Sequence, residues 1–179
     1  MESSVVMEKK IQYPMVSLRA LEPEDLECLY EIENDMSLWN FGVTNVPYSK
    51  NVILDYITQS TGDIYTDKQV RLMAENNKGE VVGIVDLMDF SPKHNRAELG
   101  LVVKDEYRGM GYAASILAKV IEYAKNTIHL HQIYAFVPEN NKSCVKLMQV
   151  SGFQWTMLIE EWLFDGDNYK NAIFFQRFL

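Results

Sequence analysis

Cysteine is scarce in this chain of 179 residues. Its two cysteines, Cys28 and Cys144, stand far apart and form neither the close pairs of a zinc site nor a disulfide framework. Such cysteine usage is typical of proteins from a reducing compartment. The sequence therefore predicts a protein without disulfides and without a metal site.

Long hydrophobic runs are missing as well. No window approaches the ~20 consecutive apolar residues that a membrane-spanning helix needs. The first residues also lack the basic and apolar parts of a signal peptide. We therefore expect no membrane association and a cytoplasmic location.

Positive charge is in deficit. Lys and Arg number 17 against 25 Asp and Glu, so the formal net charge is −8 and the calculated pI is about 4.9. Proteins that bind nucleic acid without regard to sequence need a basic surface. The charge excludes that class and is compatible with a cationic partner.

The overall amino-acid composition is that of an ordinary globular domain. The chain is 47% hydrophobic, and its length suits one domain with a substantial core. Residues 1–14 are interpreted as a short extension and residues 15–179 as the domain. Strands and helices alternate along it, which predicts an α/β fold. Strands are predicted at 16–21, at 96–104, at 131–138 and in hairpins within 69–90 and 153–179, and helices at 23–34, 46–60, 112–125 and 141–151.

Local patterns support these elements. The helix at 46–60 has Ser49 as a candidate N-cap, and Val52, Ile53, Tyr56 and Ile57 are expected to face inward. An Asn-Lys-Gly turn separates the two strands of the first hairpin. In the strand at 96–104, alternate apolar residues share one face, namely Ala97, Leu99, Leu101 and Val103.

A glycine-containing turn follows this strand and opens the helix at 112–125. The pattern is R-x-x-G-x-A, formed by Arg108, Gly111 and Ala113, with Gly109 between. A helix start presents free backbone N–H groups and a positive dipole end, and glycine lets an anion approach them. The turn therefore indicates a phosphate or pyrophosphate site. The alternative is that the glycines serve only the backbone geometry of the turn.

These residues resemble the GCN5-related N-acetyltransferase (GNAT) family. In that family an R/Q-x-x-G-x-G/A motif after the fourth strand holds the pyrophosphate of acetyl-coenzyme A (acetyl-CoA), and "EYRGMGYA" is similar to it. The likeness extends through "LRALEPEDL", "VPENNKSCVKLMQVSGF" and "FDGDNYKNAIFF" and so covers nearly the whole chain. The subgroup it resembles most contains bacterial spermidine N-acetyltransferases and enzymes that acetylate ribosomal-protein N-termini.

The resemblance implies a fold and a set of cofactor contacts. The expected fold is a mixed, mostly antiparallel sheet, flanked by about four helices, in which the fourth and fifth strands splay apart to admit the pantetheine arm. The residues implied to bind acetyl-CoA are Leu101, Val102, Val103, Arg108, Gly109, Met110, Gly111, Tyr112, Ala113, Ala114 and Asn141. For Asn141, a plain N-cap role is an equally good interpretation.

Acetyl transfer to an amine needs a group that removes a proton, because a primary amine with a pKa of about 10.4 is protonated at pH 7. Glu98, in the "RAE" segment, matches a glutamate to which the family often assigns this role. The alternative for Glu98 is an ion pair with Arg96, which contributes little if it is exposed.

One position departs from the family. Many relatives have a tyrosine four residues before the "GF" pair, where it protonates the leaving thiolate, and here that position is Met148. Methionine has no proton to give. Water or another hydroxyl, such as that of Tyr112 or Tyr134, could replace it, or transfer could be slow or lost. Cys144 is interpreted as a packing residue and not as a nucleophile.

The acceptor is predicted to be a primary amine. By resemblance to spermidine enzymes, Asp86 and Asp89 are candidate substrate-binding carboxylates, and a polyamine such as spermidine is the first candidate, with other small amines beside it. Glu33, near the end of the first helix, is a third candidate, for which a solvated helix end is the alternative interpretation. An acidic pair of those relatives is replaced here by Asn45 and Val46, which weakens the polyamine interpretation. The alternatives are a protein N-terminus as acceptor, or a degenerate protein that senses acyl-CoA.

A homo-oligomer is expected if the last hairpin exposes its apolar residues.

Overall fold

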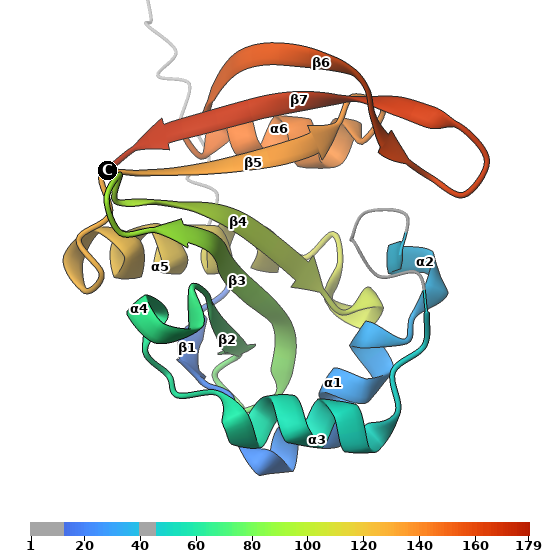
Figure 1. Cartoon of the computed structure of the whole chain (residues 1–179), viewed down its shortest axis with the longest axis vertical. Helices are drawn as coiled ribbons and strands as arrows, with labels where there is room; N and C mark the ends of the chain where they lie inside the picture. The colour runs from blue at the N-terminus through green and yellow to red at the C-terminus, as the bar shows by residue number, and fades with distance from the viewer. Residues whose placement is uncertain (1–12, 40–45) are drawn as a thin grey trace, which may run out of the picture.

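The computed structural model describes residues 13–39 and 46–179, which form one seven-stranded sheet with helices on both faces (Figure 1). Residues 1–12 of the predicted extension, and Asn45, lie outside the described residues. The strands are β1 (Ser17–Ala20), β2 (Val70–Glu75), β3 (Val81–Ser91), β4 (Arg96–Val103), β5 (Gln132–Pro138), β6 (Gln154–Phe164) and β7 (Tyr169–Phe178). The helices are α1 (Leu26–Glu33), α2 (Met36–Trp39), α3 (Lys50–Gln59), α4 (Ile64–Asp67), α5 (Tyr112–Asn126) and α6 (Lys142–Val150), with 3-10 turns η1 (Pro23–Asp25) and η2 (Asp105–Tyr107).

The strand order is β1-β2-β3-β4-β5-β7-β6. Neighbouring strands are antiparallel except for β4 and β5, which are parallel because α5 carries the chain from one to the other. The predicted fold class, a mixed and mostly antiparallel sheet in one domain, is confirmed. No helix in the described part of the chain is long and apolar enough to cross a membrane.

Two apolar clusters cover the two faces of the sheet. The larger one includes Ile116, Leu117 and Val120 of α5, whose apolar stripe was predicted from its helical spacing. The smaller one joins α1 and α3 to β2 and β3 through Leu29, Ile53 and neighbouring residues. The sheet therefore lies between two helical layers.

The predicted elements are present, with two corrections. About four helices were expected and the described residues form six, because the one-turn helices α2 and α4 are too short to show a periodic pattern. The second correction concerns α3. Ser49 caps this helix, because its hydroxyl accepts the N–H of Val52 at 3.3 Å. Val52 was expected to face inward, and that prediction is wrong, since its side chain is 51% exposed. Ile53 and Ile57, one turn apart, fill the buried face, and a residue just before Ile53 points about 100° away from it.

Candidate active site

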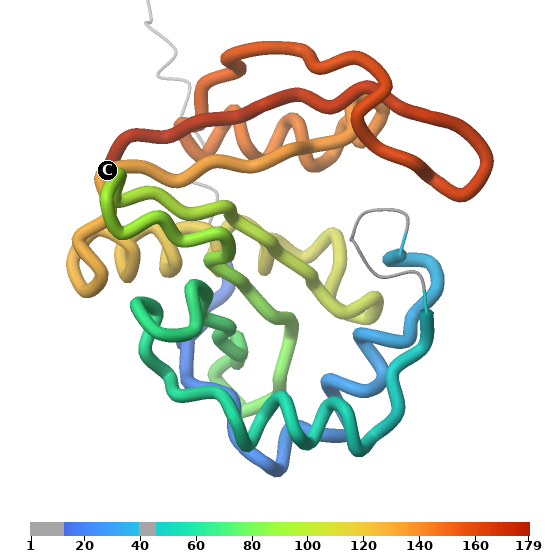
Figure 2. Tube along the Cα trace, in the orientation of Figure 1, coloured from blue at the N-terminus to red at the C-terminus, as the bar shows by residue number. Residues whose placement is uncertain are grey.

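The fork between β4 and β5 is the centre of the candidate site. The two strands pair only where Arg96–Glu98 face residues 132–134, and beyond Glu98 they separate. The tube trace shows them together near the C-terminus and diverging toward the other end of the sheet (Figure 2). The predicted splay is confirmed. Leu101, Val102 and Val103 lie on the separated part, where β4 makes no ladder with β5 and its edge fits a strand-like ligand.

The glycine turn lies at the start of α5, as expected. Gly109 and Gly111 have φ angles of 74° and 89°, in the left-handed region that glycine tolerates best. Gly111 is the N-cap of the 15-residue helix, and no side chain caps it, so the first amides of α5 have no side-chain acceptor. Met110 is exposed, and Tyr112, Ala113 and Ala114 form the first turn of the helix.

Gly111 also accommodates the chain's own N-terminal segment. A Cβ atom at Gly111 would lie 3.2 Å from the ring of Tyr13 and 3.2 Å from Pro14, and the Ser115 hydroxyl donates to the Pro14 carbonyl at 2.6 Å. A Cβ atom at Gly109 would have no other atom within 4 Å. The bare backbone at Gly111 is therefore needed for contact within the molecule as well as for the turn.

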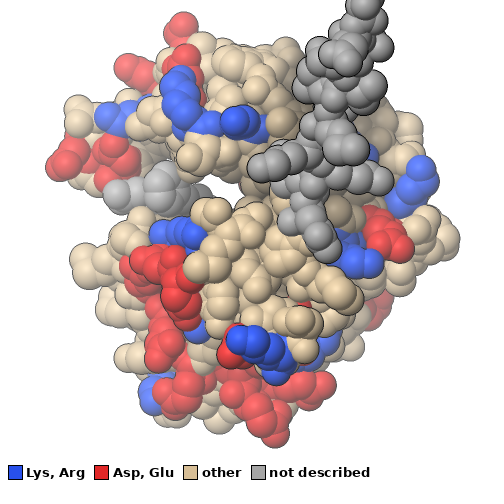
Figure 3. All heavy atoms as spheres, turned by 180° about the vertical axis from the view of Figure 1, so that it is seen from behind, with Lys and Arg blue, Asp and Glu red and all other residues tan. Residues whose placement is uncertain are grey.

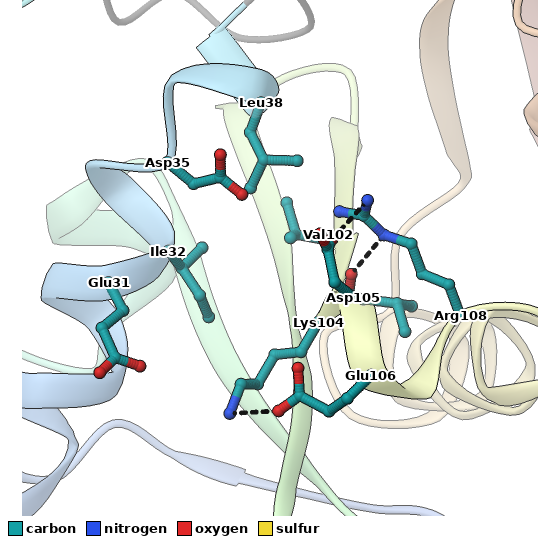
Figure 4. Close-up of a pocket in the computed structure, with 10 residues that line it drawn as sticks. Glu31, Ile32, Asp35, Leu38, Val102, Lys104, Asp105, Glu106 and Arg108 are labelled. Atoms are coloured by element: carbon teal, nitrogen blue, oxygen red, sulfur yellow. Dashed lines mark hydrogen bonds and ion pairs between the residues drawn. The ribbon is translucent and has the colours of Figure 1, made fainter.

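Arg108 points back toward the end of β4. Its Nε donates to the Val103 carbonyl at 2.9 Å, and its guanidinium lies 2.5 Å from Asp105. A pocket of about 210 Å³ opens beside it, between the end of β4 and the α1–α2 corner (Figure 4). Its charged lining residues are Glu31, Asp35, Lys104, Asp105, Glu106 and Arg108.

Asn141 is the N-cap of α6, because its Oδ1 accepts the N–H of Cys144 at 3.1 Å. The capping role weighed for Asn141 is thus confirmed. Burial raises the pKa of the Cys144 thiol. A thiol that resists ionisation is a poor nucleophile, which agrees with the packing role expected for this cysteine.

Glu98 lies at the last paired rung of the fork, opposite Tyr134. Its side chain is on the face opposite the buried Ala97 and Leu99. Burial raises the pKa of the Glu98 carboxyl, and the nearby negative charge of Asp89 raises it further. Among the described residues, no ion pair joins Glu98 to Arg96, so the alternative interpretation of Glu98 is wrong.

Asp89 reaches the Glu98 face through a β-bulge. The β3–β4 register shifts between Met88 and Ser91, and Asp89 has a φ angle of 47°. Leu87 and Phe90 both point into the larger core cluster, although residues three apart in a regular strand would lie on opposite faces. The bulge between them therefore shifts the alternation of side chains by one residue. Bulges commonly re-aim side chains near functional sites in this way.

The hydroxyl of Tyr134 donates to Asp89 Oδ2 at 2.7 Å, which links β5 to β3 across the fork. Burial and this hydrogen bond raise the pKa of Tyr134. Met148, at the position of the family tyrosine, is 3% exposed and packs in the larger cluster. Tyr134 is thus opposite Glu98 in the β4–β5 ladder, and its hydroxyl proton is directed at Asp89.

The candidate acceptor carboxylates do not act as one group. Glu33 of α1 and Asp86 of β3 meet at Arg71 of β2, whereas Asp89 lies with Tyr134. The sequence reasoning missed Arg71. A register shift between Ala74 and Glu75 places Arg71 opposite Asp86, so the turn residues alone gave no signal for this pair.

Comparison with known proteins agrees with this geometry. The profile of the acetyltransferase (GNAT) domain family matches residues 16–154. Spermidine N(1)-acetyltransferase of Escherichia coli strain K12 is 27% identical over 158 residues, which cover 88% of this chain and 83% of the relative. The chain belongs to the GNAT family of acetyl-CoA-dependent N-acetyltransferases.

Solved structures show the same fold. A spermidine N-acetyltransferase of Vibrio cholerae in complex with CoA and spermine superposes with a TM-score of 0.82 at 23% identity, covering 91% of this chain and 95% of that one. A structure of the Vibrio cholerae enzyme described as dodecameric gives a TM-score of 0.77 at 23% identity, with 91% and 93% coverage.

Proposed function

We propose that the protein transfers an acetyl group from acetyl-CoA directly to a primary amine in a ternary complex, with Glu98 as the general base. The observation that carries this proposal is the position of Glu98. It is a half-buried carboxylate at the last rung of the β4–β5 fork, directly before the strand edge that lacks a β5 partner. A base is needed there because the acceptor amine arrives protonated at neutral pH.

Bound acetyl-CoA supplies a thioester, at which one carbon–nitrogen bond forms as one carbon–sulfur bond breaks and the thiolate leaves. The ammonium nitrogen loses two protons in all. To give the nucleophilic amine, Glu98 takes the first of them, directly or through a water molecule. Its raised pKa brings it closer to that of the ammonium group and makes it a better base. The second proton passes from the nitrogen through water to the departing thiolate, since Met148 has none to give.

The residues proposed to hold acetyl-CoA come from three elements. The main chain of Leu101, Val102 and Val103 offers strand-like hydrogen bonds on the open edge of β4. The amides of residues 108–114 surround the uncapped start of α5, which favours a pyrophosphate. Arg108 contributes a positive charge when its guanidinium leaves Asp105 and contacts the ligand. Asn141, at the start of α6, is the third contact.

The acceptor is proposed to be a small amine. Relatives named for spermidine support a polyamine as the first compound to test, with other small amines beside it. A protein N-terminus is the second acceptor class. The free cysteines, Cys28 and Cys144, support a reducing compartment, and we propose the cytoplasm.

The test is release of CoA thiol from acetyl-CoA in the presence of an amine panel. We expect turnover with at least one amine, and we expect Glu98→Gln to lower kcat by about a hundredfold or more while acetyl-CoA still binds. Glu122→Gln, an exposed change on α5, is the matched control and should leave turnover intact. Full activity of Glu98→Gln would contradict the assignment of the base.

A second candidate function follows from the buried Met148. Without a hydroxyl at that position, the protein could bind acyl-CoA as a sensor and not turn it over. Calorimetric binding of acetyl-CoA without thiol release for any amine or peptide would favour the sensor. Turnover that disappears in Glu98→Gln would rule it out.

A further inference from the structure

The side chain of Arg108 folds back onto the end of β4. Its Nε donates to the Val103 carbonyl at 2.9 Å, and its Nη1 lies 2.5 Å from Asp105 Oδ1. Asp105 precedes Arg108 by three residues, in the turn η2 between β4 and α5. Two contacts with its own turn and strand therefore direct the guanidinium at the end of β4.

The Val103 carbonyl belongs to the edge of β4 that faces away from β3. The N–H of Lys104 donates to the Val82 carbonyl of β3 at 3.0 Å, and neighbouring residues of a strand point their backbone groups to opposite sides. The backbone groups of Val103 therefore point to the side where the fork leaves β4 without a β5 partner. Arg108 thus occupies the last acceptor on the edge that is proposed to pair with the pantetheine arm.

The pairing of Arg108 with Asp105 is separate from the ion pair beside it. Glu106, the next residue along, pairs with Lys104 at 2.9 Å, and Figure 4 shows its side chain turned toward Lys104 and away from Arg108. Within the described residues, the ion pair of Arg108 is the one with Asp105. Each carboxylate of the turn therefore has its own cation, and one pair can be changed without breaking the other.

Phosphates at the start of α5 would compete with Asp105 for the guanidinium. In the proposed complex, the pyrophosphate of acetyl-CoA lies on the amides of residues 108–114 and is contacted by Arg108. The guanidinium presents its N–H donors on a rigid plane, and its Nε and Nη1 already have acceptors. Asp105 also has the same sign of charge as the phosphates and repels them at short range. Both effects oppose the binding of CoA.

The geometry points to Asp105 as a positioning residue that competes with the phosphates of the cosubstrate for Arg108, weakens CoA binding and so promotes release of the product CoA. This inference rests on the proposed function, because it concerns the cosubstrate of the same reaction. Asp105 acts through Arg108 and not on the reacting atoms. Product release limits turnover in many enzymes, so a carboxylate that returns Arg108 to the strand end favours the next cycle.

The first measurement is the Kd of CoA, by calorimetry, for the wild-type chain and for Asp105→Asn. The side chains of Arg108 and Asp105 are 46% and 69% exposed, and an exposed ion pair is weak. We therefore expect Kd to fall by about two- to fivefold. Inhibition of turnover by the product CoA should strengthen by the same factor. An unchanged or higher Kd in Asp105→Asn would overturn the inference.

A double-mutant cycle tests whether the effect passes through Arg108. Arg108→Gln should weaken CoA binding, and adding Asp105→Asn to that variant should give little further change in Kd, because the competition has lost its object. A gain of the same size with and without Arg108 would mean that Asp105 acts only by repelling the phosphates, which would overturn the positioning role.

Glu106→Gln is the matched control, because it removes a charge of the same sign from the neighbouring residue, whose partner is Lys104. Its effect on Kd should be the same with and without Arg108, and a dependence on Arg108 as large as that of Asp105→Asn would contradict the specific pairing. The two levels of the argument fail differently. If no chain binds CoA, the proposed function is contradicted, whereas equal binding by the wild-type chain and Asp105→Asn contradicts only the role of Asp105.

Discussion

Glu98 illustrates how its neighbours set the chemistry of one residue. It lies on a strand between apolar residues, and the bulge in β3 brings Asp89 to the same face. Burial and the charge of Asp89 both favour the protonated carboxyl and so raise the pKa of Glu98. Tyr134 holds Asp89 in place through a hydrogen bond of 2.7 Å.

We expect Asp89→Asn to move the acid limb of the pH–rate profile to lower pH. A general base works only when ionised, so activity falls as the pH drops through the pKa of Glu98. Removing the charge of Asp89 lowers that pKa, so activity persists to more acidic pH. The profile of kcat/KM against pH measures the shift, with Asp55→Asn on the solvent face of α3 as control. An unmoved acid limb would mean that Asp89 does not influence the base.

At the scale of elements, two features form the proposed cosubstrate site. The fork leaves an edge of β4 without a β5 partner, and the turn before α5 leaves helix amides without a side-chain cap. Backbone groups that lack a ladder partner or a side-chain cap are available to a ligand, and the Val103 carbonyl becomes so once Arg108 releases it. The turn depends on two glycines with positive φ angles, of which only Gly111 also touches another segment.

Gly111→Ala should weaken both the fold and CoA binding. A left-handed alanine costs about 1–2 kcal/mol, or about 2–8 °C in Tm for a chain of this size, and its Cβ would also press on Tyr13 and Pro14. Gly109→Ala has the same backbone cost without the clash, so its Tm should fall less. Thermal melts and calorimetry with CoA measure both effects. Equal losses in the two variants would show that the contact with Tyr13 and Pro14 contributes nothing.

At the scale of the whole molecule, charge and apolar surface are unevenly distributed. Seen from behind, Asp and Glu gather mainly over the lower half, which holds α1 and α3 (Figure 3). The β6–β7 hairpin instead exposes large apolar side chains, namely those of Trp155, Met157, Leu158, Trp162, Phe164, Tyr169 and Phe178. Extended apolar surface of this kind is typical of protein interfaces.

We expect the purified protein to be a homo-oligomer assembled through this hairpin. Light scattering should give a mass that is a multiple of 20.7 kDa, and Met157→Glu should reduce it by placing a charge in the interface. Val52→Glu, at a residue similarly exposed on α3, is the matched control and should leave the mass unchanged. A wild-type mass of 20.7 kDa would contradict the expectation.

The sequence by itself determined the order of the strands and of the longer helices, the fold class and the start of α5, but not the short helices α2 and α4. These follow from local rules, because periodicity, capping residues such as Ser49 and glycines such as Gly111 act within a few residues. It also singled out Glu98, through resemblance to the family. The side chain of Val52 was wrongly predicted to be buried, because the buried face of α3 is narrower than the number of its apolar residues suggests.

Only the tertiary structure decided which charges meet. The guanidinium of Arg71 on β2 pairs with Glu33 of α1 and with Asp86 of β3. No spacing in the chain indicates that one guanidinium joins both carboxylates. Likewise, a bulge that slips the alternation by one residue turned Asp89 toward Tyr134. Electrostatics acts through space and not along the sequence, so the character of the acceptor site emerged only when the strands were paired.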